Sequence, residues 1–207
     1  MKNNNTLIHR FITGSILAAL AVTAYTQLST HAVSFIIGLI ACYALVVEWP
    51  QFNNCYLLPF YPLASMLCII IMNEETILLP FIVIIVASTD TIAYCIGRLW
   101  GKYLLAPAIS PKKTWEGFIA GLLGGSSIGL LLAPYFTISL DIKTIVFVIL
   151  ISCMATLGDL FESYLKRRSH IKDSGSLLPG HGGVLDRIDS LLFAAPAGYF
   201  FYKVFGL

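Results

Sequence analysis

The sequence of 207 residues is 57% hydrophobic, only 12% of its residues are charged, and its formal net charge is +2. An ordinary soluble domain carries about 25% charged residues, so this chain has too few to cover a soluble surface. The same figures exclude a disordered chain and a basic protein that binds nucleic acid. We therefore expect an integral membrane protein.

Seven apolar segments are long enough to cross a bilayer as helices, which takes about 20 residues each. They cover residues 11–28, 32–49, 55–72, 77–97, 115–136, 143–163 and 189–206. The first segment also resembles a signal peptide, since Lys2 and Arg10 precede its apolar core. A retained span is favoured, because cleavage would leave no soluble domain to secrete. The sequence predicts a single all-α domain over residues 1–207, a polytopic transmembrane helix bundle.

The distribution of positive charge predicts the orientation of this bundle. Eleven of the thirteen Lys and Arg residues lie before span one, between spans four and five, or between spans six and seven. With seven spans these three regions fall on one side of the membrane, and basic residues mark the cytoplasmic side. We expect a cytoplasmic N-terminus, a bacterial inner-membrane location and a site that faces the cytoplasm.

The long connection before span five contains further signals. Ser110 and Pro111 suit the start of a helix, and Thr114 can cap the helix that follows. Lys112 and Lys113 could bind a phosphate, although a purely topological role is equally plausible. The glycines of span five repeat every four residues, at 117, 121, 125 and 129, which is typical of a close-packed helix face.

Carboxylates gather near the cytoplasmic ends of three spans. Asp90 lies inside span four, Asp159 near the end of span six and Asp186 just before span seven. Carboxylates that converge at low dielectric repel each other unless a cation is bound, and their hard oxygen ligands suit Mg²⁺. We expect Asp159 and Asp186 to be metal ligands, with Asp90 as a third. For Glu48, Glu116 and Asp189, simple capping or solvation is an equally good interpretation.

The long connection before span seven combines a basic cluster with a glycine-rich turn. The cluster comprises Lys166, Arg167, Arg168 and Lys172. Gly182 and Gly183 follow His181, and such turns let backbone N–H groups approach phosphate oxygens. Arg187 directly follows Asp186. Together with the carboxylates, these residues have the composition of a phosphoryl or nucleotidyl transfer site, although the cluster alone could be only an orientation signal.

The stretch from Ser163 to Asp189 resembles the C-terminal signature of the phosphatidate cytidylyltransferases, also called CDP-diacylglycerol synthases. That signature pairs S-x-x-K-R with K-D and ends in P-x-H-G-G-x-x-D-R-x-D. Three shorter stretches resemble the same family: 89–98, 110–117 and 158–163. The resemblance covers about residues 80–205, with the catalytic signature region at about 85–190. Family members are usually longer, by about two spans at the N-terminal end.

The resemblance implies an enzyme of phospholipid biosynthesis that converts CTP and phosphatidate into CDP-diacylglycerol and pyrophosphate. It also implies Mg²⁺ as the cofactor, and a homodimer is possible. On this interpretation Asp159, Asp186 and Arg187 are catalytic. The residues expected to bind substrate are Lys112, Lys113, Lys166, Arg167, Lys172, His181, Gly182 and Gly183. The choice of CTP rests on the resemblance alone.

Two alternatives remain at this level. The first is a cytidylyltransferase or kinase that acts on another lipid phosphate or a polyprenol. The second is a membrane transporter, which would place its polar groups near the bilayer midplane and not at one face. A CDP-alcohol phosphotransferase is disfavoured, because the sequence lacks a D-G-x-x-A-R motif.

Overall fold

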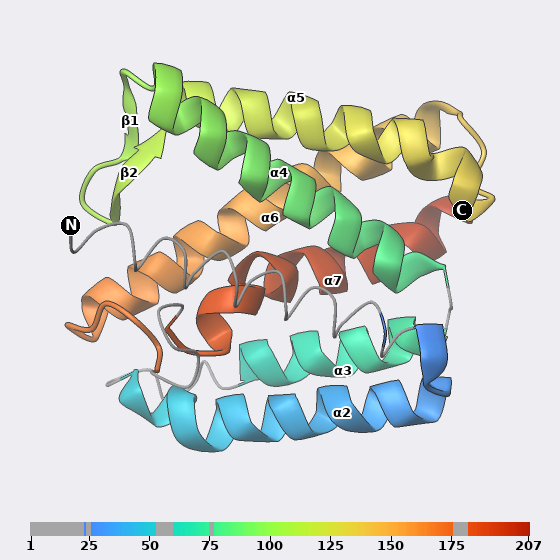
Figure 1. Cartoon of the computed structure of the whole chain (residues 1–207), viewed down its shortest axis with the longest axis horizontal. Coiled ribbons are helices and arrows are strands. Elements are labelled where there is room, and N and C mark those ends of the chain that lie inside the picture. The colour runs from blue at the N-terminus through green and yellow to red at the C-terminus, as the bar shows by residue number, and fades with distance from the viewer. Residues whose placement is uncertain (1–22, 24–25, 53–59, 75–76, 176–181) are drawn as a thin grey trace.

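The computed structural model describes residues 23, 26–52, 60–74, 77–175 and 182–207 (Figure 1). Within them the chain forms helices and one two-stranded sheet. In order these are α2 (Thr30–Tyr43), the π-helical turn η1 (Ala44–Glu48), the 3₁₀ turn η2 (Trp49–Gln51), α3 (Phe60–Glu74), α4 (Leu78–Trp100), β1 (Leu104–Ala106), β2 (Ser110–Thr114), α5 (Trp115–Leu132), the 3₁₀ turn η3 (Ala133–Phe136), α6 (Ile142–Arg168) and α7 (Leu185–Phe205).

Four of the expected spans are helices long and apolar enough to cross a membrane. They are Thr30–Gln51, Leu78–Trp100, Trp115–Phe136 and Ile142–Arg168. The expected third span corresponds to α3, whose described part is 15 residues long. The expected seventh span corresponds to α7, 21 residues long, whose first turns carry charged side chains. The expected first span, 11–28, lies almost wholly outside the described residues.

Local sequence signals explain where these helices begin. Thr114 caps α5 by accepting a hydrogen bond from Gly117 N, as predicted. At the opposite end of the bundle, Asp141 accepts a bond from Thr144 N and caps α6. Such caps satisfy N–H groups that have no partner within the helix. The expectation that Ser110 and Pro111 start a helix is wrong.

Ser110 and Pro111 belong to strand β2, which pairs antiparallel with β1. The fold is therefore an all-α bundle with one small β-hairpin, and the strictly all-α prediction needs this correction. A physical reason is Thr114, whose extended backbone and side chain cap the helix, so the residues before it stay extended. The hairpin lies at the end of the bundle where α4 ends and α5 begins (Figure 1).

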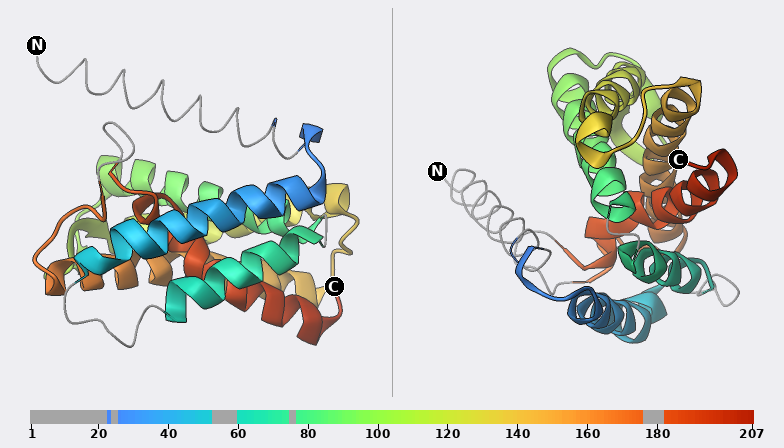
Figure 2. Two further views of the ribbon diagram at one scale, coloured as in Figure 1. Left: turned by 90° about the horizontal axis from the view of Figure 1, so that it is seen from below. Right: turned by 90° about the vertical axis from the view of Figure 1, so that its right-hand side faces the viewer.

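The helices pack in two groups around α7. On one side α4, α5 and α6 contact one another, and on the other side α2 packs on α3. Helix α7 contacts α6, α4 and α3 and so joins the two groups (Figures 1 and 2). The most deeply buried side chains of this core include Phe81, Ile82, Ile85, Phe147, Ile151 and Leu192.

The glycine repeat of α5 forms the contact with α4, as the spacing predicts. A Cβ at Gly121 would lie 2.7 Å from Ala93 Cβ and 2.8 Å from Thr89 O, so no larger residue fits there. Next to this contact, Ser152 of α6 accepts hydrogen bonds from Thr89 and Ser126, at 3.2 and 3.3 Å. Three helices are thus joined by hydroxyl groups inside the apolar core.

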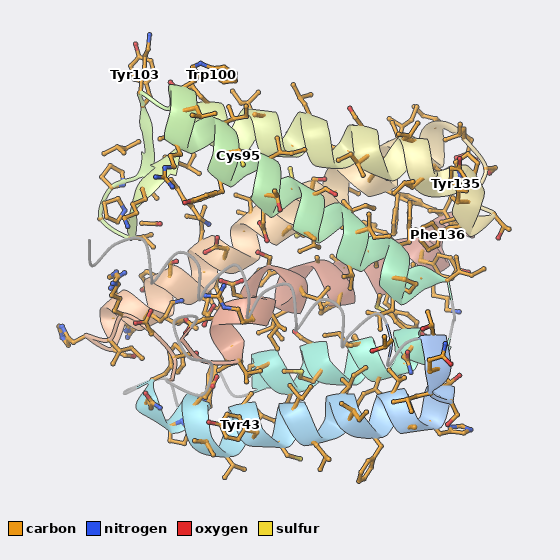
Figure 3. The ribbon with its side chains drawn as sticks, viewed as in Figure 1. Tyr43, Cys95, Trp100, Tyr103, Tyr135 and Phe136 are labelled. Atoms are coloured by element: carbon orange, nitrogen blue, oxygen red, sulfur yellow. The ribbon has the colours of Figure 1, made fainter. Side chains whose placement is uncertain are left out.

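The polar ends of several elements meet at one end of the bundle. Helices α2, α4 and α6 end there, while α5 and α7 begin there (Figure 1). Exposed aromatic side chains mark both ends: Trp100 and Tyr103 at this end and Tyr135 at the other (Figure 3). Aromatic side chains are enriched at the two interfaces of a membrane. The arrangement agrees with an integral membrane protein whose polar site lies at one face.

Candidate active site

A polar cavity of about 390 Å³ lies where α4, α6 and α7 approach one another. Its lining residues come from three parts of the chain: Asp90 and Tyr94 of α4, Asp159 and Lys166 of α6, and Asp173, Asp186, Arg187 and Asp189 from the connection to α7 and its first turns. The three aspartates expected to bind metal therefore line one cavity, as predicted from their positions at span ends.

A second, larger cavity of about 770 Å³ shares Asp90, Tyr94 and Asp159 with the first. Its other walls come from α4, the hairpin, α5 and Thr156 of α6. They combine basic side chains with apolar ones: Arg98, Lys112 and Lys113 with Ala93, Leu105 and Phe118. The two cavities therefore meet at a common wall of two carboxylates and a phenol.

Among the described residues, three donors hold Asp186. Lys166 Nζ lies 2.7 Å from its Oδ1, and the N–H groups of Ser174 and Gly183 each donate to its Oδ2 at 2.8 Å. Burial alone would raise the pKa of this carboxyl, but Lys166 and the two N–H groups favour its charged form, and the net pKa lies below the usual range. Asp186 is therefore an ionised carboxylate with a fixed orientation.

Asp159 is paired with a cation from the hairpin. Lys113 Nζ lies 2.6 Å from its Oδ2, and the Ser163 hydroxyl lies 3.4 Å from its Oδ1. Both side chains of the ion pair are partly exposed, at 23% and 31%. Strand β2 thus reaches across to α6 at the wall that the two cavities share.

The basic residues predicted to bind phosphate separate into two groups. Lys112, Lys113, Lys166 and Arg187 line the cavities. Arg167 is exposed and donates to the carbonyl groups of Ile109 and Ile171, so it ties the hairpin turn to the end of α6. Lys172 is exposed too and lines neither cavity. Their predicted role as phosphate ligands stays a prediction.

The glycine-rich turn lies against the carboxylates. Gly182 has a φ of +82°, a left-handed conformation that favours glycine, and a Cβ there would lie 2.6 Å from Asp186 Oδ2. The N–H of Gly183 points at Asp186. In this structure the turn therefore positions Asp186. His181 lies outside the described residues.

Several lining residues were not among the predicted site residues. Helical spacing places Asp189 three residues after Asp186 and Tyr94 four residues after Asp90, and it could also have identified Arg98, eight residues after Asp90. Asp173 belongs to the connection before α7, where sequence spacing says little about distance. Glu162 is also buried near the site, with Lys166 Nζ 3.6 Å from its Oε2.

The donor set fits a hard divalent cation. Among the described residues no three Asp, Glu, His or Cys side chains form a ready metal group. Mg²⁺ needs no such cage, because it binds through one or two carboxylates and takes its other ligands from water and substrate phosphates. Asp159 and Asp186, which both line the polar cavity, can supply those two carboxylates.

Comparison with known proteins matches residues 2–205 to the model of the cytidylyltransferase family. A phosphatidate cytidylyltransferase of Rickettsia typhi is 35% identical over 210 residues, which cover 94% of this chain and 91% of that protein. One from Rickettsia bellii is 35% identical over 216 residues, covering 96% and 92%.

A further relative is longer than this chain. The phosphatidate cytidylyltransferase of Staphylococcus saprophyticus is 48% identical over 118 residues, covering 56% of this chain and 45% of that protein. The chain is thus similar to the two Rickettsia proteins over nearly their whole length, and to the Staphylococcus protein over about half.

Proposed function

This chain belongs to the cytidylyltransferase family and is a nucleotidyltransferase, and we propose that it transfers the cytidylyl group of CTP to phosphatidate. The products are CDP-diacylglycerol and pyrophosphate, and the reaction serves phospholipid biosynthesis. The relatives that match nearly all of this chain are phosphatidate cytidylyltransferases.

The observation that carries this proposal is the pair of cavities with a shared wall. One is almost entirely polar, as a triphosphate with its counter-charges requires. The other combines three basic side chains with apolar walls, as a phosphate on a lipid requires. We assign CTP to the first and phosphatidate to the second. The two reacting phosphates then meet beside Asp159.

In this arrangement a phosphate oxygen of phosphatidate attacks the α-phosphorus of CTP. A new P–O bond forms there, the bond to the β-phosphate oxygen breaks, and pyrophosphate leaves with that electron pair. The protein orients two anions and offsets their repulsion. Lys112, Lys113 and Arg98 face the lipid phosphate, while Arg187 faces the triphosphate. Lys166 keeps Asp186 ionised and in place.

Mg²⁺ is the proposed cofactor, held by Asp159 and Asp186 with Asp90 beside them. When bound, it supplies a positive charge that offsets the negative charge on the transferring phosphate. Lys113, the lysine partner of Asp159, would then shift toward a phosphate oxygen, while Lys166 stays on Asp186. The ion pair of Lys113 with Asp159 is partly exposed, so Lys113 can exchange the carboxylate for a phosphate oxygen.

We also propose that the site faces the cytoplasm of a bacterial cell, with the protein in the inner membrane and the N-terminus inside. The basic residues of the three predicted cytoplasmic regions support this orientation. The seven-span count and a homodimer remain predictions.

The test is pyrophosphate release by the purified protein in detergent with phosphatidate and labelled CTP. We expect labelled CDP-diacylglycerol only with Mg²⁺, and loss of product when EDTA is added. Offering a polyprenol or another lipid phosphate in place of phosphatidate separates the alternatives. Faster turnover with one of those acceptors would contradict the proposed substrate.

A further inference from the structure

Glu48 is a fully buried carboxylate outside the two cavities. It ends the π-helical turn η1, and its side chain is 0% exposed. An acidic side chain is almost never fully buried unless hydrogen-bond partners satisfy it. The hydrogen bonds of the Glu48 carboxylate therefore explain how it can be fully buried.

Those partners belong to the start of α7. Val184 N donates to Glu48 Oε1 at 2.7 Å, and Leu185 N donates to Oε2 at 2.8 Å. The first N–H groups of a helix have no partner within it. Val184, the N-cap residue, provides no side-chain cap of its own. Glu48, 136 residues earlier in the sequence than Val184, caps α7 in its place.

The described residues before α7, 173–175 and 182–184, form the site loop, and this loop also contacts Asp186. Ser174 donates its hydroxyl to Glu48 Oε2 at 3.2 Å and its N–H to Asp186 Oδ2 at 2.8 Å. Gly183 donates its N–H to Asp186, and a Cβ on Gly183 would lie 2.7 Å from Glu48 Oε1. Ser174 and Gly183 therefore lie between two carboxylates, Glu48 on one side and Asp186 on the other.

We propose that Glu48 is a positioning residue for the transfer reaction, which acts by fixing the start of α7 and thereby the orientation of Asp186 and Arg187. The inference rests on the proposed function. Because Glu48 lines neither cavity, it acts through the loop and not on substrate. It also links η1, which continues helix α2, to the start of α7.

The test compares Glu48→Gln with Asn73→Ala. Glutamine keeps the size of the side chain, but its amide NH₂ faces an N–H donor where a carboxylate oxygen stood. Asn73 is also buried, and it donates to Thr30 O and Ser34 Oγ at 3.0 Å each. It therefore anchors α2 to α3 far from the site loop. Ser174→Ala, which removes only the hydroxyl bond to Glu48, is the milder second variant.

We expect Glu48→Gln to lower kcat by about tenfold or more, as the loss of a charge-assisted hydrogen bond predicts, with a change in the KM for phosphatidate below about threefold. Amide hydrogen exchange of the substrate-free protein should be faster at residues 182–187 and unchanged in α5. Asn73→Ala should lower thermal stability without either effect. Ser174→Ala should change both readouts in the same direction as Glu48→Gln, but less.

Wild-type kcat and wild-type loop exchange in Glu48→Gln would overturn the inference. So would an equal loss of kcat in Glu48→Gln and Asn73→Ala at equal thermal stability. If Glu48→Gln does not fold, Ser174→Ala decides by the same two readouts. A wild-type protein that forms no CDP-diacylglycerol would contradict the proposed function, while the exchange measurement would still decide whether Glu48 fixes the loop.

Discussion

Lys113 of strand β2 forms an ion pair with Asp159 of α6, with 2.6 Å between Nζ and Oδ2. This contact links the hairpin between α4 and α5 to α6, which carries Asp159, a carboxylate that lines both cavities. It also lies on the wall of the larger cavity, which both residues line. The pair therefore connects the two cavities in which the proposed reaction takes place.

Lys113→Met should reduce CDP-diacylglycerol formation by about tenfold to a hundredfold, because it removes a cation from the wall that faces the lipid phosphate. Stability should change by less than about 1 kcal/mol, since exposed ion pairs contribute little. Steady-state kinetics with phosphatidate in mixed micelles would measure the first effect. Activity equal to that of the wild type would exclude Lys113 from the site.

Asp186→Asn should abolish Mg²⁺-dependent turnover, with a loss of about a hundredfold or more, while the protein still inserts into the membrane. The change removes a charge that Lys166 and the two backbone donors hold in place. Asp141→Asn is the matched control. It lies at the opposite end of α6, and asparagine caps a helix as well as aspartate does. Turnover of Asp186→Asn at the level of that control would contradict the metal assignment.

Gly183→Ala should lower activity strongly, because the new Cβ would lie 2.7 Å from both Glu48 Oε1 and Gly175 N. The loop must then move away from Asp186, whose carboxylate accepts the Gly183 N–H. Gly38→Ala in α2 serves as the comparison, since nothing lies within 4 Å of a Cβ there. Activity assays on both variants at matched expression would show whether the loop tolerates the methyl group.

Gly121→Ala should destabilise the bundle by about 1–3 kcal/mol, because overpacking separates closely packed helices. The contact concerned is between α5 and α4, where a Cβ meets Ala93 and Thr89. Thermal unfolding in detergent is the appropriate measurement. An unfolding midpoint equal to that of Gly38→Ala would show that α4 and α5 do not pack this closely.

Sequence spacing accounts for the cavity-lining residues that lie on one helix. Asp90, Tyr94 and Gly97 line the larger cavity together because residues three, four and seven apart share a helix face. It failed in the connections between helices. Ser110 and Pro111 form a strand and not a helix start.

By itself the sequence predicted a helical membrane protein with a catalytic signature region at about residues 85–190. Hydropathy, charge distribution and the C-terminal signature are properties of the linear chain. Only the tertiary structure decided that Glu48 caps α7 and that Lys113 pairs with Asp159. The physical reason is that spacing fixes which residues are neighbours within a helix. Which helices meet, and at what depth, depends on packing contacts such as those of Gly121 and Gly183.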